Sequence, residues 1–164
     1  MELAGSCHCR EVHFTVQSHT PYPYMRCFCS ICRKTAGGGG FAINIMGVAE
    51  TLAVTGEAHI SVYQARLYDP SDLQAAATSP GKRHFCKQCG SALWLWDPRW
   101  PELVHPFASA IDTPLPEPPE HWNIFLADKP SWVTVPRGAA DHDVPGYPPE
   151  SIEAWHRRLG LWLP

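Results

Sequence analysis

Hydrophobic and polar residues alternate over short stretches, which predicts that most of the chain forms short β-strands. In residues 10–16, Val12, Phe14 and Val16 would share the buried face of one strand. Similar patterns predict further strands at residues 41–46, 51–54, 59–63, 92–96, 121–126 and 131–135. The 17 prolines and 12 glycines favour short strands over long helices. Four tryptophans fall within these strands, and we expect them in the core: Trp94, Trp96, Trp122 and Trp132.

A helical pattern is clear only near the end of the sequence. Ile152, Trp155 and Leu159 share one helical stripe, with two prolines before it and Gly160 as a stop signal. Residues 69–81 are rich in Asp, Ser, Ala and Pro and predict a loop, with one or two helical turns at residues 73–77. Four prolines in residues 113–119 predict an extended connector. We therefore expect residues 1–164 to form a single, mainly β domain with a C-terminal α-helix.

Charge and hydropathy exclude several classes of protein. The formal net charge is −3, and the basic runs are only two or three residues long, which argues against a nucleic-acid partner. No stretch reaches the ~20 apolar residues that a membrane-spanning helix needs. The first residues lack the basic start and apolar run of a signal peptide. These features predict a protein of the reducing cytoplasm, without a membrane partner.

The seven cysteines change this picture most, because they all stand in three tight groups. The groups are C-x-C at Cys7 and Cys9, C-x-C-x2-C at Cys27, Cys29 and Cys32, and C-x2-C at Cys86 and Cys89. An odd number of cysteines fits poorly with a fold held only by disulfides. Closely spaced thiolates are typical ligands of soft metal ions. Seven thiolates would complete one four-ligand site and leave a second site one ligand short.

Spacing alone leaves the division of these thiolates open. Cys86 and Cys89 form a strong half-site that needs a second pair. Pairing them with Cys7 and Cys9 leaves Cys27, Cys29 and Cys32 as a compact set of three. Pairing them with Cys29 and Cys32 instead would leave Cys7, Cys9 and Cys27. Compactness favours the first division, because three thiolates within six residues can converge without help from the rest of the fold.

The cysteine motifs resemble those of the glutathione-dependent formaldehyde-activating enzyme family, which includes centromere protein V-type proteins. The resemblance rests on the motifs Gly5-Ser6-Cys7-His8-Cys9, Cys27-Phe28-Cys29-Ser30-Ile31-Cys32-Arg33-Lys34 and His84-Phe85-Cys86-Lys87-Gln88-Cys89-Gly90-Ser91, and on His121-Trp122-Asn123-Ile124, Pro130-Ser131-Trp132 and Ser151-Ile152-Glu153-Ala154-Trp155-His156. It implies an Mss4-like fold of short antiparallel strands organised around two zinc ions per chain. It also implies a structural zinc at Cys7, Cys9, Cys86 and Cys89, and a second, substrate-facing zinc at Cys27, Cys29 and Cys32.

The family activity implies that the chain is a carbon–sulfur lyase resembling S-(hydroxymethyl)glutathione synthase. Its partners would be a small thiol such as glutathione and an aldehyde. A zinc ion held by three thiolates suits a fourth, substrate thiol, because a coordinated thiol loses its proton. Arg33, Lys34 and His84 are candidate helpers beside the cysteines. The glycines at residues 37–40 are a candidate loop for binding a carboxylate, with a merely flexible loop as the alternative.

A second hypothesis is a zinc-stabilised binding module in which both metal sites are structural and no catalysis occurs. A fourth, non-cysteine ligand at the second site would favour that hypothesis, and an open position would favour the enzyme. An iron–sulfur protein is a third interpretation, which the C-x-C spacing disfavours.

Overall fold

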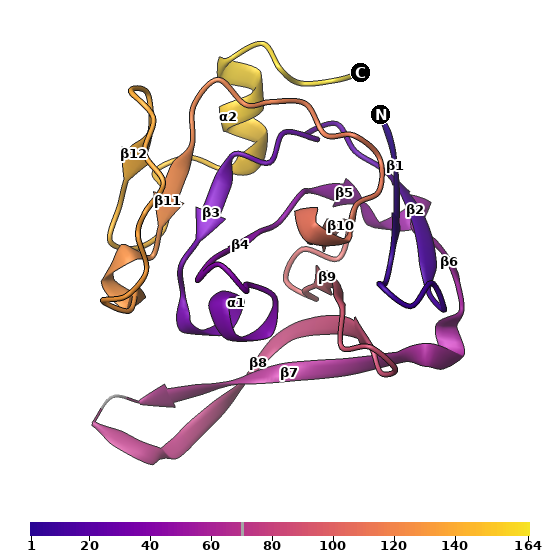
Figure 1. Ribbon diagram of the computed structural model, residues 1–164, viewed down its shortest axis with the longest axis horizontal. Helices are drawn as coiled ribbons and strands as arrows, with labels where there is room; N and C mark the ends of the chain where they lie inside the picture. Colours follow the sequence, from indigo (N-terminus) through magenta and orange to yellow (C-terminus); the bar gives the residue numbers. More distant parts are fainter. Residues whose placement is uncertain (70) are drawn as a thin grey trace.

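The computed structural model describes residues 1–69 and 71–164, and in residues 69 and 72–76 it describes the backbone but not the side chains. The fold is mainly β, as predicted, and its strands form three sheets (Figure 1). The first sheet has the order β1-β2-β6 and contains β1 (Glu2–Ser6), β2 (His13–Gln17) and β6 (Ala53–Thr55). Val12, Phe14 and Val16 are buried, which confirms the predicted face.

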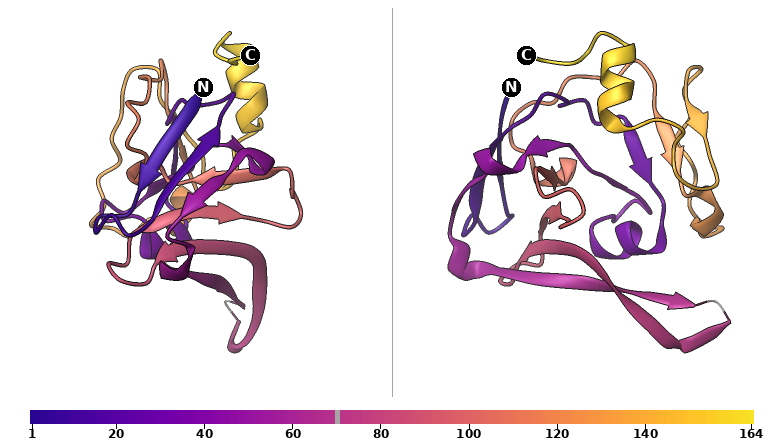
Figure 2. Two further views of the ribbon diagram at one scale, coloured as in Figure 1. Left: turned by 90° about the vertical axis from the view of Figure 1, so that its right-hand side faces the viewer. Right: turned by 180° about the vertical axis from the view of Figure 1, so that it is seen from behind.

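The second sheet is antiparallel and has the order β5-β10-β9-β8-β7. Its strands are β5 (Gly47–Val48), β7 (Ile60–Asp69), β8 (Asp72–Cys86), β9 (Ala92–Trp96) and β10 (Leu103–Pro106). The hairpin of β7 and β8 projects from the body of the molecule, as all three ribbon views show (Figures 1 and 2). The predicted strand at residues 92–96 is β9 with the same bounds.

The prediction of a loop with helical turns at residues 69–81 is wrong. Asp69 ends β7, and residues 72–81 belong to β8, where Ala77 pairs with Leu67 and Thr78 with Arg66 of β7. Helix propensity of an alanine run is a weak preference, and cross-strand pairing overrides it. Pro80 lies at a register shift, where the ladder can lose an N–H donor. Pro70, also within the predicted loop, lies outside the described residues.

The third sheet has the order β12-β11-β3-β4 and mixes parallel with antiparallel pairs. Its strands are β3 (Met25–Cys27), β4 (Ala42–Ile43), β11 (Trp122–Ile124) and β12 (His142–Asp143). β11 runs parallel to both β3 and β12, so this part of the molecule departs from the all-antiparallel arrangement expected.

The predicted strand at residues 131–135 is not formed. Val133 and Val135 are buried against Phe28, which explains the hydrophobic alternation without a strand. The ammonium group of Lys129 donates to the carbonyl of Val133 at 2.8 Å, where a ladder bond was expected. Trp132 is 70% exposed, so its predicted place in the core is also wrong.

The helices are short. The predicted C-terminal helix is α2 (Ile152–Arg158), which Ser151 caps by accepting from the N–H of Ala154, and Gly160 follows it with φ +67°. A second helix, α1 (Ser30–Thr35), was not predicted. Four 3-10 turns complete the elements: η1 (Ala49–Thr51), η2 (Glu57–His59), η3 (Ala108–Ala110) and η4 (Leu126–Asp128). None of the described helices has the length and apolar character to cross a membrane.

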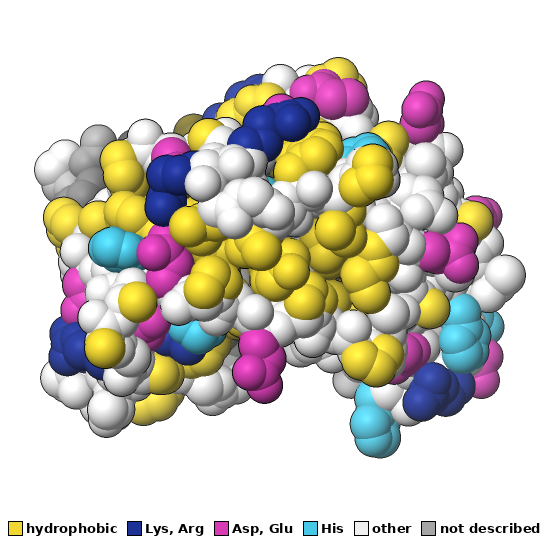
Figure 3. All heavy atoms as spheres, turned by 90° about the horizontal axis from the view of Figure 1, so that it is seen from above, with side chains coloured by type: hydrophobic (Ala, Val, Ile, Leu, Met, Phe, Trp, Pro, Cys, Tyr) yellow, Lys and Arg dark blue, Asp and Glu magenta, His cyan; other side chains and the backbone are white. Residues whose placement is uncertain are grey.

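The hydrophobic interior divides into two main clusters, and each contains buried cysteines. Cys7 and Cys86 belong to the cluster between the first two sheets, together with Phe14 and Trp94. Cys27 and Cys32 belong to the cluster that includes Trp155 of α2. On the surface that carries α2, acidic and basic side chains are interspersed around a band of hydrophobic ones (Figure 3).

Candidate metal centres

The first cysteine cluster joins two turns that lie far apart in the sequence. Cys7 and Cys9 come from the turn after β1, and Cys86 and Cys89 from the turn between β8 and β9. Their four Sγ atoms all lie within 4.8 Å of one another. Gly90 follows with φ +75° and donates its N–H to the carbonyl of Cys86 at 2.8 Å, which closes the second turn tightly. The structure therefore brings together the pairs that compactness had favoured.

The sulfur atoms of this cluster lie within hydrogen-bonding distance of one another. The Sγ atom of Cys9 lies 3.5 Å from that of Cys7 and 3.7 Å from that of Cys86. The hydroxyl and backbone N–H of Ser91, together with contacts from Cys9, lower the pKa of Cys89 to about 5. A cluster with a ready thiolate and neighbours that lose protons on binding suits a soft cation. All seven cysteines are free thiols, so no disulfide competes for these sulfurs.

The second cysteine cluster is local in sequence. Cys27 ends β3, Cys29 is the N-cap of α1 and Cys32 lies within α1. The Sγ atom of Cys29 accepts the backbone N–H of Cys32 at 3.3 Å. This bond begins the helix at Cys29 and turns Cys32 back toward Cys27. The three Sγ atoms lie within 4.8 Å of one another, with Cys27 and Cys32 each 5% exposed and Cys29 partly exposed.

Hydrogen bonding concentrates negative charge of this cluster on Cys29. The thiols of Cys27 and Cys32, aided by backbone N–H groups, lower the pKa of Cys29 to about 2. The pKa of Cys27 is raised, because its thiol bonds to Cys29 and Cys32 and is buried. Among the described His, Cys, Asp and Glu residues, none joins these three sulfurs as a fourth ligand. Within the part of the chain that the structure describes, the cluster therefore offers three sulfur ligands to a metal ion.

The three predicted helper residues, Arg33, Lys34 and His84, differ in burial and in their contacts. Lys34 is exposed on α1, and Arg33 has a buried Nε atom without a hydrogen-bond partner. His84 stacks on Trp94 with 5.0 Å between ring centroids, and its buried Nδ1 also lacks a partner. Burial lowers the pKa of His84, so its ring is neutral at pH 7. His84 also lines the smaller of the two cavities described below.

Two of the four glycines after α1 are required by the conformation of the turn. A Cβ atom at Gly37 would lie 2.1 Å from the carbonyl oxygen of Phe41, and Gly40 has φ +89° against Val133. Gly38 has nothing within 4 Å of such an atom. Two of the four glycines are therefore required by the turn itself, whatever they bind.

Two adjoining cavities lie between the cysteine clusters. The larger, of about 480 Å³, is bordered by Ser6, Cys7, Arg10 and Asp112. The smaller, of about 300 Å³, is bordered by Tyr63, Arg83, His84 and aromatic residues. Both are lined by Thr35, Gly90 and Ala92.

Sequence reasoning missed Arg83 and Tyr63. No short-range pattern singles them out, because Arg83 and Tyr63 come together only through the pairing of β8 with β7. Arg83 pairs with Tyr63 of β7 and Leu95 of β9, while His84 pairs with Trp94.

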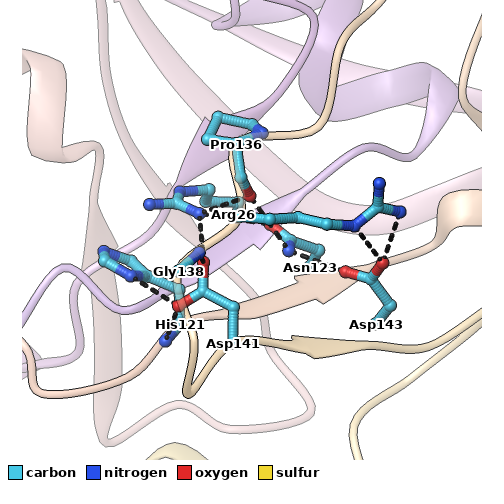
Figure 4. Close-up of polar contacts among 8 residues, drawn as sticks. Arg26, His121, Asn123, Pro136, Gly138, Asp141 and Asp143 are labelled. Atoms are coloured by element: carbon cyan, nitrogen blue, oxygen red, sulfur yellow. Dashed lines mark hydrogen bonds and ion pairs between the residues drawn. The ribbon is translucent and has the colours of Figure 1, made fainter.

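A buried ion-pair network supports the second cluster from the opposite face of β3. Arg26, which precedes Cys27, contacts the carboxylate of Asp141 at 3.2 Å, and their side chains are 13% and 6% exposed (Figure 4). The same carboxylate accepts the N–H of Gly138 at 2.9 Å and that of His121 at 3.0 Å. Burial alone would raise the pKa of Asp141, but these donors outweigh it and lower the pKa. The network ties residues 136–143 to the strands that position Cys27.

Comparisons with known proteins agree with this arrangement. A model of the glutathione-dependent formaldehyde-activating enzyme family matches residues 2–128. A protein of Halomonas elongata, provisionally named a glutathione-dependent formaldehyde-activating enzyme, is 58% identical over 161 residues, which is 98% of each chain. A crystal structure of a Rhodobacter sphaeroides protein shares the fold with a TM-score of 0.51 and 24% identity, over 71% of this chain and 92% of that one.

The Mss4-like fold expected from the resemblance is confirmed, as mainly antiparallel strands around two cysteine clusters with a short C-terminal helix. The three cysteine motifs that suggested the resemblance form those clusters. The chain therefore belongs to the glutathione-dependent formaldehyde-activating enzyme family.

Proposed function

We propose that this chain is a zinc-dependent carbon–sulfur lyase that forms and cleaves thiol–aldehyde adducts, with glutathione and formaldehyde as thiol and aldehyde. The observation that carries the proposal is the three-thiolate cluster of Cys27, Cys29 and Cys32, which has no fourth ligand among the described residues. A closed structural zinc site needs four protein ligands, whereas a catalytic site keeps one position open. The same observation weighs against a binding module with two structural zinc sites.

The residues of both clusters fit zinc. Zn–S bonds of ~2.3 Å in a tetrahedron place sulfurs about 3.8 Å apart. The Sγ separations of 3.5 and 3.7 Å in the four-cysteine cluster are close to that value. In our proposal Cys7, Cys9, Cys86 and Cys89 hold a structural zinc, and Cys27, Cys29 and Cys32 hold the zinc that receives substrate. Seven free thiols also suit the reducing cytoplasm, where we place this single domain of residues 1–164.

When bound, the second zinc would keep a substrate thiol deprotonated near neutral pH. In the forward reaction the thiolate sulfur forms a bond to the formaldehyde carbon, and the carbonyl oxygen gains a proton. The reverse reaction breaks that carbon–sulfur bond and returns the thiol and the aldehyde. The chain contributes the walls of the smaller cavity, including Phe85 and Phe107, and the cation of Arg83 borders the same space. His84 borders the same cavity as a neutral ring.

The test is NMR exchange spectroscopy on glutathione and ¹³C-formaldehyde, which form the adduct spontaneously. We expect the metal-loaded protein to raise the exchange rate between free formaldehyde and S-(hydroxymethyl)glutathione well above the protein-free rate. Metal analysis of the same sample should give two zinc ions per chain. An exchange rate equal to the protein-free rate, at full zinc occupancy, would contradict the proposed reaction.

A further inference from the structure

Arg83 differs from most arginines of this chain because it has no anionic partner among the side chains that the structure describes. Its Nε atom is buried and makes no hydrogen bond. Six of the nine arginines form ion pairs with carboxylates: Arg10, Arg26, Arg99, Arg137, Arg157 and Arg158. A guanidinium stays charged in proteins, and leaving a buried donor unpaired is costly. An unpaired, partly buried guanidinium is therefore suited to an anion that comes from outside the chain.

The position of Arg83 connects that anion site to the three-cysteine cluster. Arg83 borders the cavity of about 300 Å³, whose walls also include Thr35 and Phe107. Thr35 follows Cys32 by three residues on α1, and Phe107 packs in the hydrophobic cluster that contains Cys27 and Cys32.

The other cations near the clusters are less suited to this role. Arg10 borders the adjoining larger cavity, but Asp112 already contacts it at 3.5 Å. Arg33 and Lys34, which sequence reasoning favoured, border neither cavity. Lys82 lies beside Arg83 on β8 but places its ammonium 5.3 Å from the ring centroid of Trp96.

We propose that Arg83 is the specificity-determining residue of the site and binds a carboxylate of the thiol substrate. This inference rests on the proposed function and deepens it, since it makes the substrate class a thiol that carries a carboxylate within reach of the sulfur. A guanidinium can bind a carboxylate through two parallel N–H donors, which orients the ligand as well as holding it. The sulfur would then extend past Thr35 toward Cys32.

The experiment compares two thiols of similar size by calorimetric titration of the protein purified with its metal. 3-Mercaptopropionate carries a carboxylate where 2-mercaptoethanol carries a hydroxyl. We expect wild-type protein to bind the acid about 10- to 100-fold more tightly, the range for a hydrogen bond to a charged group. Arg83→Gln should remove this preference while leaving the affinity for 2-mercaptoethanol and the metal content unchanged. Glutathione and its dimethyl ester should show the same pattern.

Lys82→Gln is the matched control, since it removes the same charge from the neighbouring position and should keep the preference. If Arg83→Gln does not fold, Arg83→Lys keeps the charge but loses the paired donors, and should bind the acid with an intermediate preference. The titration contains no aldehyde, so the preference can only come from the carboxylate of the thiol.

The outcomes separate this inference from the proposed reaction. A wild-type protein without the preference overturns the inference, as does a preference that survives in Arg83→Gln. Equal loss of affinity for both thiols in Arg83→Gln also overturns it, because the residue would then not recognise the carboxylate. A preference that depends on Arg83, in a protein that does not accelerate adduct exchange, supports the inference and contradicts the proposed reaction.

Discussion

The two cysteine clusters use the same ligand chemistry in opposite structural settings. The four-cysteine cluster joins turns 77 residues apart, counted from Cys9 to Cys86, and its buried members lie in the core between the first two sheets. The three-cysteine cluster lies within six residues at the junction of β3 and α1. A metal that joins distant turns closes a long loop and stabilises the whole fold. A metal held locally adds little to the tertiary structure, and this leaves its ligand set free to serve a reaction.

The largest expected effect is the loss of stability in Cys86→Ser. This residue is completely buried and belongs to the cluster that joins the distant turns. Loss of the metal there should lower the free energy of unfolding by at least ~4 kcal/mol. Chemical denaturation and metal analysis would measure both changes. Unchanged stability in a variant that has lost one zinc ion would contradict the claim that the four-cysteine cluster stabilises the fold.

Cys29→Ser should produce the complementary result. Serine is a good N-cap, so α1 keeps its first capping bond while the metal loses one thiolate. We expect the part of the adduct exchange rate that the protein adds to the protein-free rate to fall about 100-fold or more, with zinc content near one and only a small change in melting temperature. Unfolding as severe as that of Cys86→Ser would show that both clusters are structural.

Asp141→Asn tests whether the network behind β3 supports the local cluster. The change leaves the buried guanidinium of Arg26 without its ion-pair partner, which should cost about 2 kcal/mol of stability. We expect zinc to be lost from the three-cysteine cluster at lower chelator concentration, with the four-cysteine cluster unaffected. Equal zinc loss from both clusters would contradict a local role.

The same variant has a pH signature. The pKa of Asp141 is lowered in the folded protein, so its ionised form stabilises the fold above about pH 4. That stability is lost as the pH falls through the lower, folded-state pKa. Wild-type protein should therefore lose more stability than Asp141→Asn on acidification below about pH 4, as measured by denaturation at several pH values.

The smallest effect concerns the turn after α1. Gly40→Ala places a side chain at φ +89° and 2.4 Å from the Cγ2 atom of Val133, so we expect a loss of about 1–2 kcal/mol. Gly38→Ala, which meets nothing within 4 Å, is the matched control and should change stability by less than ~0.5 kcal/mol. If Gly38→Ala lowers glutathione affinity without lowering stability, the turn has a binding role as well.

Regions whose structure is set by residues close together in the sequence could be predicted, and regions set by contacts between distant segments could not. The three cysteine groups and the stripe of α2 are encoded by short spacings, so the ligand groups and that helix could be predicted. The division of the groups into two clusters depends on which turns meet in space, and spacing left it open. α1 has six residues and depends on a cysteine N-cap, which no hydrophobic period reveals.

Tertiary contacts decided the features that the sequence did not reveal. Residues 73–77 follow the pairing of β8 with β7 rather than the helix propensity of alanine. The roles of Arg83 and Arg26 depend on neighbours from other strands, so their local sequence carries little signal. Val133 and Val135 alternate with polar residues as strand residues do, but the alternation arises because both side chains are buried against Phe28.

The four-cysteine cluster also fixes the alignment of the strand that carries Arg83. β8 ends at Cys86, three residues after Arg83, so a metal at Cys86 anchors that end of the strand. A slip of β8 by one residue would turn Arg83 to the other face of the sheet and separate it from its partners Tyr63 and Leu95, because successive strand residues face opposite sides. A structural metal at the four-cysteine cluster would thus hold β8 in register. Substrate specificity would then depend on a metal site that does not contact the substrate.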